Sequence, residues 1–210
     1  MKRYLLLAAA VFVAIALVAF APALAKLDYK RLPTRASWQL PDRVIEALDL
    51  RPGAQVADLG AGDGYFTFTL ADAVGAGGRV YAVDVEADVT EGLDASVASR
   101  GYDNVEVVLA EYDDPRLPDG EIDVVFLCNV YHHIDDRVSY FSDLRRDLAP
   151  GARVAIVDIR GGASVRWLSP PGHSTDLDTL VDEMTAAGYD VAATFDFLPL
   201  QNFVVFEPAE

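Results

Sequence analysis

One segment constrains the fold of this chain more than any other. The short apolar segment Gln55–Leu59 leads into residues 60–64, with the sequence GAGDG, and apolar residues then recur at helical spacing at Phe66, Leu70 and Val74. Glycines allow the backbone to turn sharply and to approach a ligand with no side chain between. This order predicts a strand, a tight turn and a helix, with the turn at the edge of a sheet where ligands bind. A plain glycine-rich turn without a ligand is the alternative.

Strand and helix patterns alternate along the rest of the chain. Apolar runs predict further strands at Arg79–Val85, Val105–Leu109, Ile122–Cys128 and Arg153–Ile159. Apolar residues at helical spacing predict four further helices. The first begins at Pro41, and the last covers residues 176–187. Between them, one helix buries Val89, Leu93 and Val97, and another, which ends before Pro150-Gly151, buries Val138, Phe141, Leu144 and Leu148. Continuous apolar strands alternating with helices indicate a doubly wound α/β domain with a parallel sheet.

The last two predicted strands break the parallel pattern. Val191–Leu198 and Asn202–Phe206 are separated only by residues 199–201. A connection this short can join antiparallel strands, but it cannot make a parallel crossover. We therefore expect the sheet to finish in a β-hairpin.

Acidic residues near the glycine turn indicate what the turn binds. Asp84 ends the second strand, where a carboxylate can accept hydrogen bonds from both hydroxyls of a ribose; capping the next helix is its alternative role. The spacing G-x-G-x-G differs from the G-x-G-x-x-G of dinucleotide sites. Asp58 and Asp63 flank the turn, and their charges would repel a pyrophosphate but suit the ammonium and sulfonium groups of S-adenosylmethionine (SAM). SAM is therefore favoured over NAD.

Four segments resemble the class I SAM-dependent methyltransferases, a Rossmann-like family. They are DLGAGDGYF at 58–66, VYAVDV at 80–85, IDVVFLCNVYHHI at 122–134 and LAPGARVAIVD at 148–158. The likeness extends over about residues 40–206. It implies a sheet of about seven strands with the last strand antiparallel, helices on both faces, and SAM as the cofactor.

The resemblance also implies roles for single residues. Asp58, Gly60 and Gly62 would line the methionine end of SAM, Asp84 would bind its ribose, and Val85 would pack on its adenine. Two acids after the third strand, Glu111 and Asp113, compete for the adenine amino group. Asn129 would lie where the amino-acid end of SAM meets the substrate, unless it is a turn residue that satisfies local backbone.

The substrate side is expected to contain Tyr131, His132, His133 and His173. His132 and His133 are candidates for a base or a hydrogen-bonding group at the acceptor, with packing or helix capping as the alternative. No metal is expected, because adjacent side chains diverge and no second cluster of ligands at metal spacing is found.

Charge and cysteine content limit the substrates and the bonding. The net charge of −16 disfavours nucleic acid as a partner, since phosphate backbones would be repelled. Cys128 is the single cysteine, so no internal disulfide forms. The expected function is methyl transfer from SAM to a small molecule. An NAD-dependent oxidoreductase and a SAM-binding protein without catalysis are the alternatives.

The first twenty-five residues have the pattern of an export signal. Lys2 and Arg3 precede an apolar run from Tyr4 to Pro22, and the small-x-small sequence Ala23-Leu24-Ala25 follows. This predicts a secretory signal peptide cleaved after Ala25, with a retained membrane anchor as the alternative. Residues 26–40 then form a linker or covering arm, and residues 41–210 form the methyltransferase domain. The protein is expected to be exported or membrane-anchored.

Overall fold

The computed structural model describes residues 34–161 and 172–209. The predicted leader, and residues 26–33 of the predicted arm, lie outside these ranges. The chain divides into two units, Met1–Ser37 and Trp38–Glu210, and the second contains the sheet. Across the described ranges, no helix is both long and apolar enough to span a bilayer.

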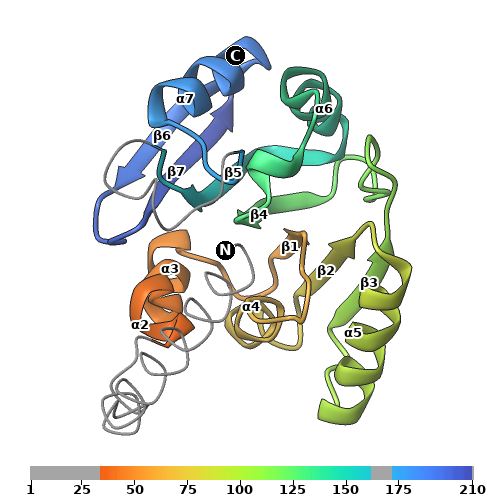
Figure 1. The fold of residues 1–210 in the computed structure, drawn as a ribbon. Coiled ribbons are helices and arrows are strands. Elements are labelled where there is room, and N and C mark those ends of the chain that lie inside the picture. The colour runs from red at the N-terminus through yellow and green to blue at the C-terminus, as the bar shows by residue number, and fades with distance from the viewer. Residues whose placement is uncertain (1–33, 162–171, 210) are drawn as a thin grey trace, which may run out of the picture. The chain divides into compact units, whose positions relative to one another are not determined.

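The sheet of the second unit has the predicted Rossmann-like topology. In the described part of the chain it has seven strands in the order β3-β2-β1-β4-β5-β7-β6 (Figure 1). The strands are β1 (Gln55–Leu59), β2 (Arg79–Asp84), β3 (Val105–Leu109), β4 (Ile122–Cys128), β5 (Leu148–Ile159), β6 (Tyr189–Phe195) and β7 (Gln201–Pro208). β1 to β5 pair in parallel, whereas β7 is antiparallel to both β5 and β6. The terminal β-hairpin is therefore confirmed.

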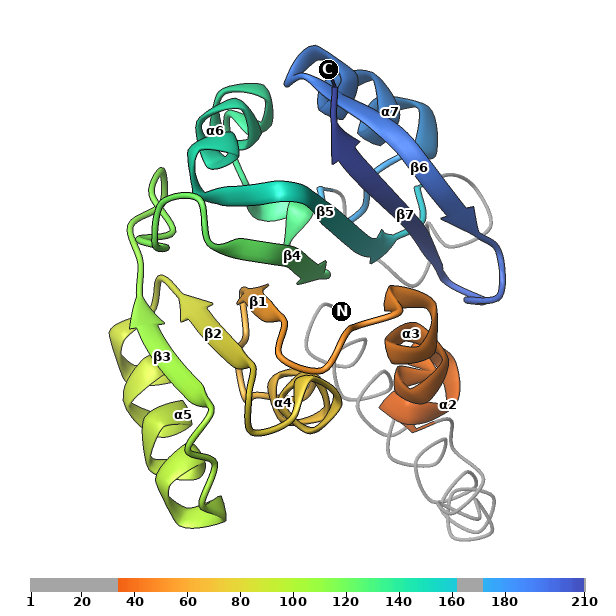
Figure 2. The same ribbon diagram turned by 180° about the vertical axis from the view of Figure 1, so that it is seen from behind.

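Helices cover both faces of this sheet, as predicted (Figures 1 and 2). The α-helices are α2 (Arg35–Gln39), α3 (Pro41–Leu48), α4 (Thr67–Val74), α5 (Ala87–Arg100), α6 (Arg137–Leu144) and α7 (Leu177–Ala186), and short 3₁₀ turns occupy Tyr131–His133 and Arg145–Asp147. On β1, Val56 packs in the cluster that contains α3 and α4, whereas Ala57 and Leu59 pack in the cluster that contains α6 and α7. Successive residues of a strand thus serve opposite faces.

The strand order places the ends of β1 and β4 side by side. From β1 the chain moves outward through β2 to β3, and it then returns to add β4 on the other side of β1. The connections after β1 and β4 therefore leave the same edge in opposite directions. Such a switch point opens a crevice at the carboxyl ends of the strands, where ligands bind in sheets of this kind.

Several predicted boundaries and core positions need correction. Leu148 pairs with Ile122 and begins β5 instead of continuing the preceding helix, so Pro150-Gly151 lies within the strand. On α5 the buried stripe uses Thr90 in place of Val89, and Val138 of α6 is exposed. The segment 26–40, expected to be a linker or covering arm, contains α2.

Candidate functional site

The glycine turn after β1 is hydrogen-bonded to the neighbouring strand β2 and packs against Val130, which follows β4. The N–H groups of Gly60 and Ala61 donate to the carbonyl of Val83 on β2, at 2.8 and 3.0 Å. Gly60 has φ 71° and Gly62 has φ 57°. A Cβ at Gly60 would collide with the side chain of Val130, which follows β4, whereas a Cβ at Gly62 would meet nothing nearer than a carbonyl at 4.0 Å. Gly60 thus permits close packing, and Gly62 leaves open space above the turn.

Asp84 at the end of β2 holds this turn in place. Its Oδ2 accepts the N–H of Gly62 at 3.0 Å, and its Oδ1 accepts the N–H of Glu86 at 3.2 Å. The N-cap residue of α5 is Glu86, so Asp84 does not cap this helix and the alternative role is wrong. A carboxylate has about four acceptor positions, so these two bonds leave room for two more donors.

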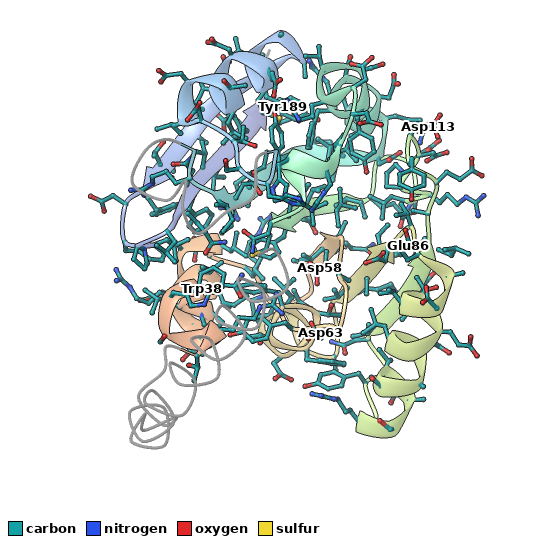
Figure 3. All side chains as sticks on the ribbon, viewed as in Figure 1. Trp38, Asp58, Asp63, Glu86, Asp113 and Tyr189 are labelled. Atoms are coloured by element: carbon teal, nitrogen blue, oxygen red, sulfur yellow. The ribbon has the colours of Figure 1, made fainter. Side chains whose placement is uncertain are left out.

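The acids that flank the glycine turn lie in different environments (Figure 3). Asp58 is buried with 2% of its surface exposed, and its Oδ2 accepts the hydroxyl of Thr67 at 2.6 Å. Asp63 is exposed, and its Oδ1 accepts the N–H of Tyr65 at 3.2 Å. Asp58 thus supports the turn from the side of α4, and its contact with the methionine end of SAM stays a prediction. Val85 is half-buried against the core on the α6 and α7 face.

The two acids proposed for the adenine amino group lie on the loop after β3. Glu111 forms an ion pair with Arg116, and Asp113 is exposed. Both line a cavity of about 490 Å³, which α6 and the 3₁₀ turn Arg145–Asp147 complete. Figure 3 shows Asp113 on the side of this loop near α6, well apart from Asp58. Which acid meets the adenine stays a prediction.

Asn129, the first residue after β4, is held by residues distant in the sequence. It has φ 59°, and its Oδ1 accepts the Nε2 of Gln201 on β7 at 2.8 Å. The neighbouring Cys128 Sγ accepts the Nε2 of Gln39 at 3.2 Å. Gln39 and Gln201 are both fully buried. Asn129 therefore does not serve as the local turn residue of the alternative interpretation; it links β4 to β7.

Tyr131 packs in the core, and its expected contact with the substrate stays a prediction. Its side chain is fully buried and stacks on Phe141, with ring centroids 5.5 Å apart. Its hydroxyl donates to Glu183 Oε2 at 2.9 Å, and Arg137 donates to both oxygens of Glu183 at 2.6 and 2.8 Å. The bonds from Arg137 lower the pKa of Glu183, and burial raises the pKa of Tyr131 well above its ordinary value.

His132 is bonded to a buried carboxylate. Its Nδ1 lies 2.7 Å from Asp158 Oδ1, near the end of β5, and only 6% of the His132 side chain is exposed. Asp158 has no exposed surface, and its Oδ2 accepts the hydroxyl of Thr175 at 2.8 Å. A carboxylate can only accept, so the hydrogen of the His132 ring lies on Nδ1. Nε2 of His132 is then the basic nitrogen.

The three predicted histidines form one cluster. The ring centroids of His132 and His133 lie 4.1 Å apart, and those of His173 lie 5.6 and 5.3 Å from them. The expectation that the adjacent pair diverges is wrong, because both residues lie in a tight 3₁₀ turn. Burial lowers the pKa of His133, and the neighbouring imidazoles act in the same direction.

Comparison with known proteins assigns the family. Residues 50–194 match the family described as a methyltransferase domain. The chain belongs to this family. Nocamycin O-methyltransferase of Saccharothrix syringae is 31% identical over 147 residues, which are 69% of this chain and 52% of that protein. The crystal structure of a SAM-dependent methyltransferase from Aquifex aeolicus has a TM-score of 0.75 and 26% identity, covering 84% of this chain and 95% of that one.

A ubiquinone/menaquinone biosynthesis C-methyltransferase of Hahella chejuensis is also similar. It is 26% identical over 79% of this chain and 59% of that protein. The chain covers between 28% and 59% of the first four curated relatives. These matches confirm the predicted class I SAM-dependent methyltransferase fold, with SAM as the cofactor.

The residues of this methyltransferase domain fit SAM. The open space above Gly62 is where a side chain would otherwise lie. Beside it, Asp84 has a partly exposed carboxylate whose two bonds leave acceptor positions for the ribose hydroxyls. Val85 follows Asp84 directly, and its apolar side chain is only half-buried.

Sequence reasoning missed three side chains that bond to the end of β4 and to the loop that follows it. Asp158 carried a signal, because it is an acid within the otherwise apolar run at the end of the fifth strand, and such acids are rarely buried unless they are paired. Nothing in the sequence pointed to Gln39 and Gln201, because their contacts with Cys128 and Asn129 depend on the strand order.

Proposed function

We propose that this protein transfers the methyl group of SAM to a small-molecule acceptor. The observation that carries the proposal is the pairing of Gly62 with Asp84 at the switch point of the sheet. The similarity to nocamycin O-methyltransferase supports an acceptor of this kind. The net charge of −16 is unfavourable for a nucleic-acid substrate.

The residues around the glycine turn would bind the cofactor. Asp84 would accept the ribose hydroxyls, Val85 would pack on the adenine, and Gly62 would let the backbone approach the ligand. When bound, SAM supplies an electrophilic methyl group on a sulfonium centre. The main task of the protein is then to hold the acceptor atom in line with that methyl, because alignment alone contributes greatly to the rate.

The acceptor would lie against the polar residues that follow β4. Gln201 holds Asn129 at the junction between this loop and the glycine turn. His133 and His173 are exposed and reach the same region from two loops. A proton must be removed only when the acceptor atom carries one that it loses during transfer. The acceptor atom can therefore be an oxygen, a nitrogen, a sulfur or a carbon, and an imidazole of this cluster would take the proton where there is one to remove.

A comparison of ligands tests the cofactor, and a labelling experiment tests the reaction. SAM or S-adenosylhomocysteine at one hundred times its Kd should stabilise the protein by about 2.7 kcal/mol, measured as a rise in Tm. A rise with NAD alone would contradict the assignment. Tritium from methyl-labelled SAM should then enter small molecules of a cell extract. Binding of SAM without any transfer of label would identify a SAM-binding protein that lacks catalysis.

We also propose that residues 1–25 direct export or anchor the domain to a membrane. The basic start, the apolar run and the small-x-small sequence that ends at Ala25 support this proposal. Fractionation of cells and the mass of the recovered protein test it. A mature chain that begins at Lys26 indicates cleavage, and an intact chain in the membrane fraction indicates an anchor. An intact chain found only among soluble cytoplasmic proteins contradicts both.

A further inference from the structure

All histidines of the chain gather at one place, on the edge of the sheet from which the glycine turn also leaves. The sequence contains three, and one ring nitrogen of each of His132, His133 and His173 lies within 4.8 Å of those of the others. We propose that these imidazoles bind a divalent transition-metal ion of the zinc class. The proposal does not depend on methyl transfer, because it concerns the histidines and the ion alone.

The first support for a metal site is the orientation of His132. Histidines that bind metal ions almost always donate their second ring N–H to a carboxylate, a carbonyl or a water, which fixes the tautomer and the ring. His132 has this arrangement, since its Nδ1 lies 2.7 Å from the buried Asp158 and its Nε2 carries the lone pair. Thr175 in turn donates to the other oxygen of Asp158 at 2.8 Å. The first ligand is therefore oriented before any ion binds.

The second support is that both loops of the cluster are fixed by backbone hydrogen bonds. The N–H of His133 donates to the carbonyl of Val130 at 2.8 Å. On the other loop, the N–H of Thr175 donates to Ile159 at 3.0 Å and its carbonyl accepts the N–H of Gly161 at 3.1 Å. Thr175 thus pairs with the end of β5 and places His173, two residues earlier, beside the other two rings.

The chemistry of the three donors defines the class of ion. Imidazole nitrogens suit Zn²⁺, Cu²⁺, Ni²⁺ and Fe²⁺, whereas Mg²⁺ and Ca²⁺ prefer oxygen ligands. With Zn–N bonds near 2.0–2.1 Å, tetrahedral ligands lie roughly 3.3 Å apart. The ring nitrogens now lie within 4.8 Å of one another, and we expect the exposed side chains of His133 and His173 to move closer when the ion binds. Three protein ligands leave a fourth position for a water or a substrate atom, as in catalytic zinc sites.

Metal titration of the purified full chain, without a polyhistidine tag, tests the proposal. Zn²⁺ followed by calorimetry should bind with a stoichiometry of one, and Co²⁺ should show the intense visible absorption of a tetrahedral site. His133→Ala and His173→Ala should each weaken the affinity for Zn²⁺ by at least about 100-fold. Asp158→Asn should weaken the affinity for Zn²⁺ by about 10–100-fold, the range typical when the carboxylate that orients a ligating histidine is lost.

An exposed acid far from the cluster provides the matched control, because the acidic surface also attracts cations. Asp190→Asn on β6 removes one negative charge and should leave the affinity for Zn²⁺ within about twofold. Circular dichroism and Tm in the absence of metal establish that each variant is folded. The proposal is overturned if the folded wild-type protein binds no stoichiometric Zn²⁺, or if both histidine variants bind it as tightly as Asp190→Asn does.

Discussion

The two sides of the ligand-binding edge are built in different ways. On the cofactor side, the backbone N–H of Gly62 bonds to Asp84, 22 positions along the chain, and the turn is shaped by backbone conformation. On the side of the loop after β4, where we propose that the acceptor lies, side chains carry the contacts. Gln201 reaches Asn129 across 72 positions, and Gln39 reaches Cys128 across 89. The first side depends on bonds between the consecutive strands β1 and β2, and the second depends on contacts between segments far apart in the sequence.

This difference has a consequence for how each side responds to substitution. A site made by backbone conformation tolerates few residues at its glycines, because the left-handed backbone there disfavours any residue with a Cβ. A site made by distant side chains loses one hydrogen bond at a time, each worth about 0.5–1.5 kcal/mol when neither group is charged. We therefore expect single substitutions to cost more on the cofactor side.

Gly60→Ala should have the largest effect on stability. The new Cβ would require a left-handed backbone at φ 71° and would collide with Val130. Backbone strain of roughly 1–2 kcal/mol and crowding of roughly 1–3 kcal/mol together give an expected loss of about 2–5 kcal/mol in the free energy of unfolding. Urea unfolding measures it.

Gly120→Ala separates strain from crowding. Gly120 has nearly the same conformation, with φ 70°, but a Cβ there would meet nothing within 4 Å. Its expected cost is therefore the backbone part alone, about 1–2 kcal/mol. Equal losses in Gly60→Ala and Gly120→Ala would show that the contact with Val130 does not constrain the turn.

Asp84→Asn should weaken cofactor binding by about 1.5–3 kcal/mol, because the ribose hydroxyls lose hydrogen bonds to a charged group. Calorimetry with S-adenosylhomocysteine measures the change as roughly 10- to 150-fold in Kd. Glu86→Gln is the matched control, since it removes the same charge from the exposed neighbouring acid. If both variants lose affinity equally, the effect comes from net charge and Asp84 makes no specific contact.

Tyr131→Phe should lower stability by about 1.5 kcal/mol, at the low end for hydrogen bonds to charged groups, since Arg137 still holds Glu183. Methyl transfer should be unchanged. Tyr112→Phe serves as a control, because that hydroxyl bonds to Glu86 on the surface and its loss should stay within about 0.5 kcal/mol. A fall in kcat without a loss of stability would support the contact of Tyr131 with the substrate.

The same contrast explains what the sequence could predict of the fold. The strands β1, β3 and β4 were predicted with their observed bounds, because continuous apolar runs and flanking turns are local signals. The start of β5 was placed five residues late, because Leu148 was assigned to a helical stripe, whereas in the structure it pairs with Ile122. Helical spacing cannot distinguish a last helical turn from the first residue of a buried strand.

The candidate site was predictable to the same extent. The glycine turn and Asp84 were predicted because each is recognisable within one short segment, as closely spaced glycines after a strand and as an acid at the end of a strand. His173 was expected on the same side as His132, but the contact between their rings was not predicted, because it depends on Thr175 pairing with the end of β5. The burial of Tyr131 was missed for a related reason, since its partner Glu183 lies on a helix 52 positions away.

Asn129→Gly should have the smallest effect and gives the sharpest test of the comparison. Glycine adopts the left-handed backbone at φ 59° without strain, so the substitution removes only the hydrogen bond from Gln201. We expect a loss below about 1 kcal/mol in urea unfolding. Asn129→Ala loses the same bond and adds backbone strain, so it should cost roughly 1 kcal/mol more. If Asn129→Gly costs as much as Asn129→Ala, the contact with Gln201 dominates; if neither differs from the wild type, the side chain of Asn129 does not link β4 to β7.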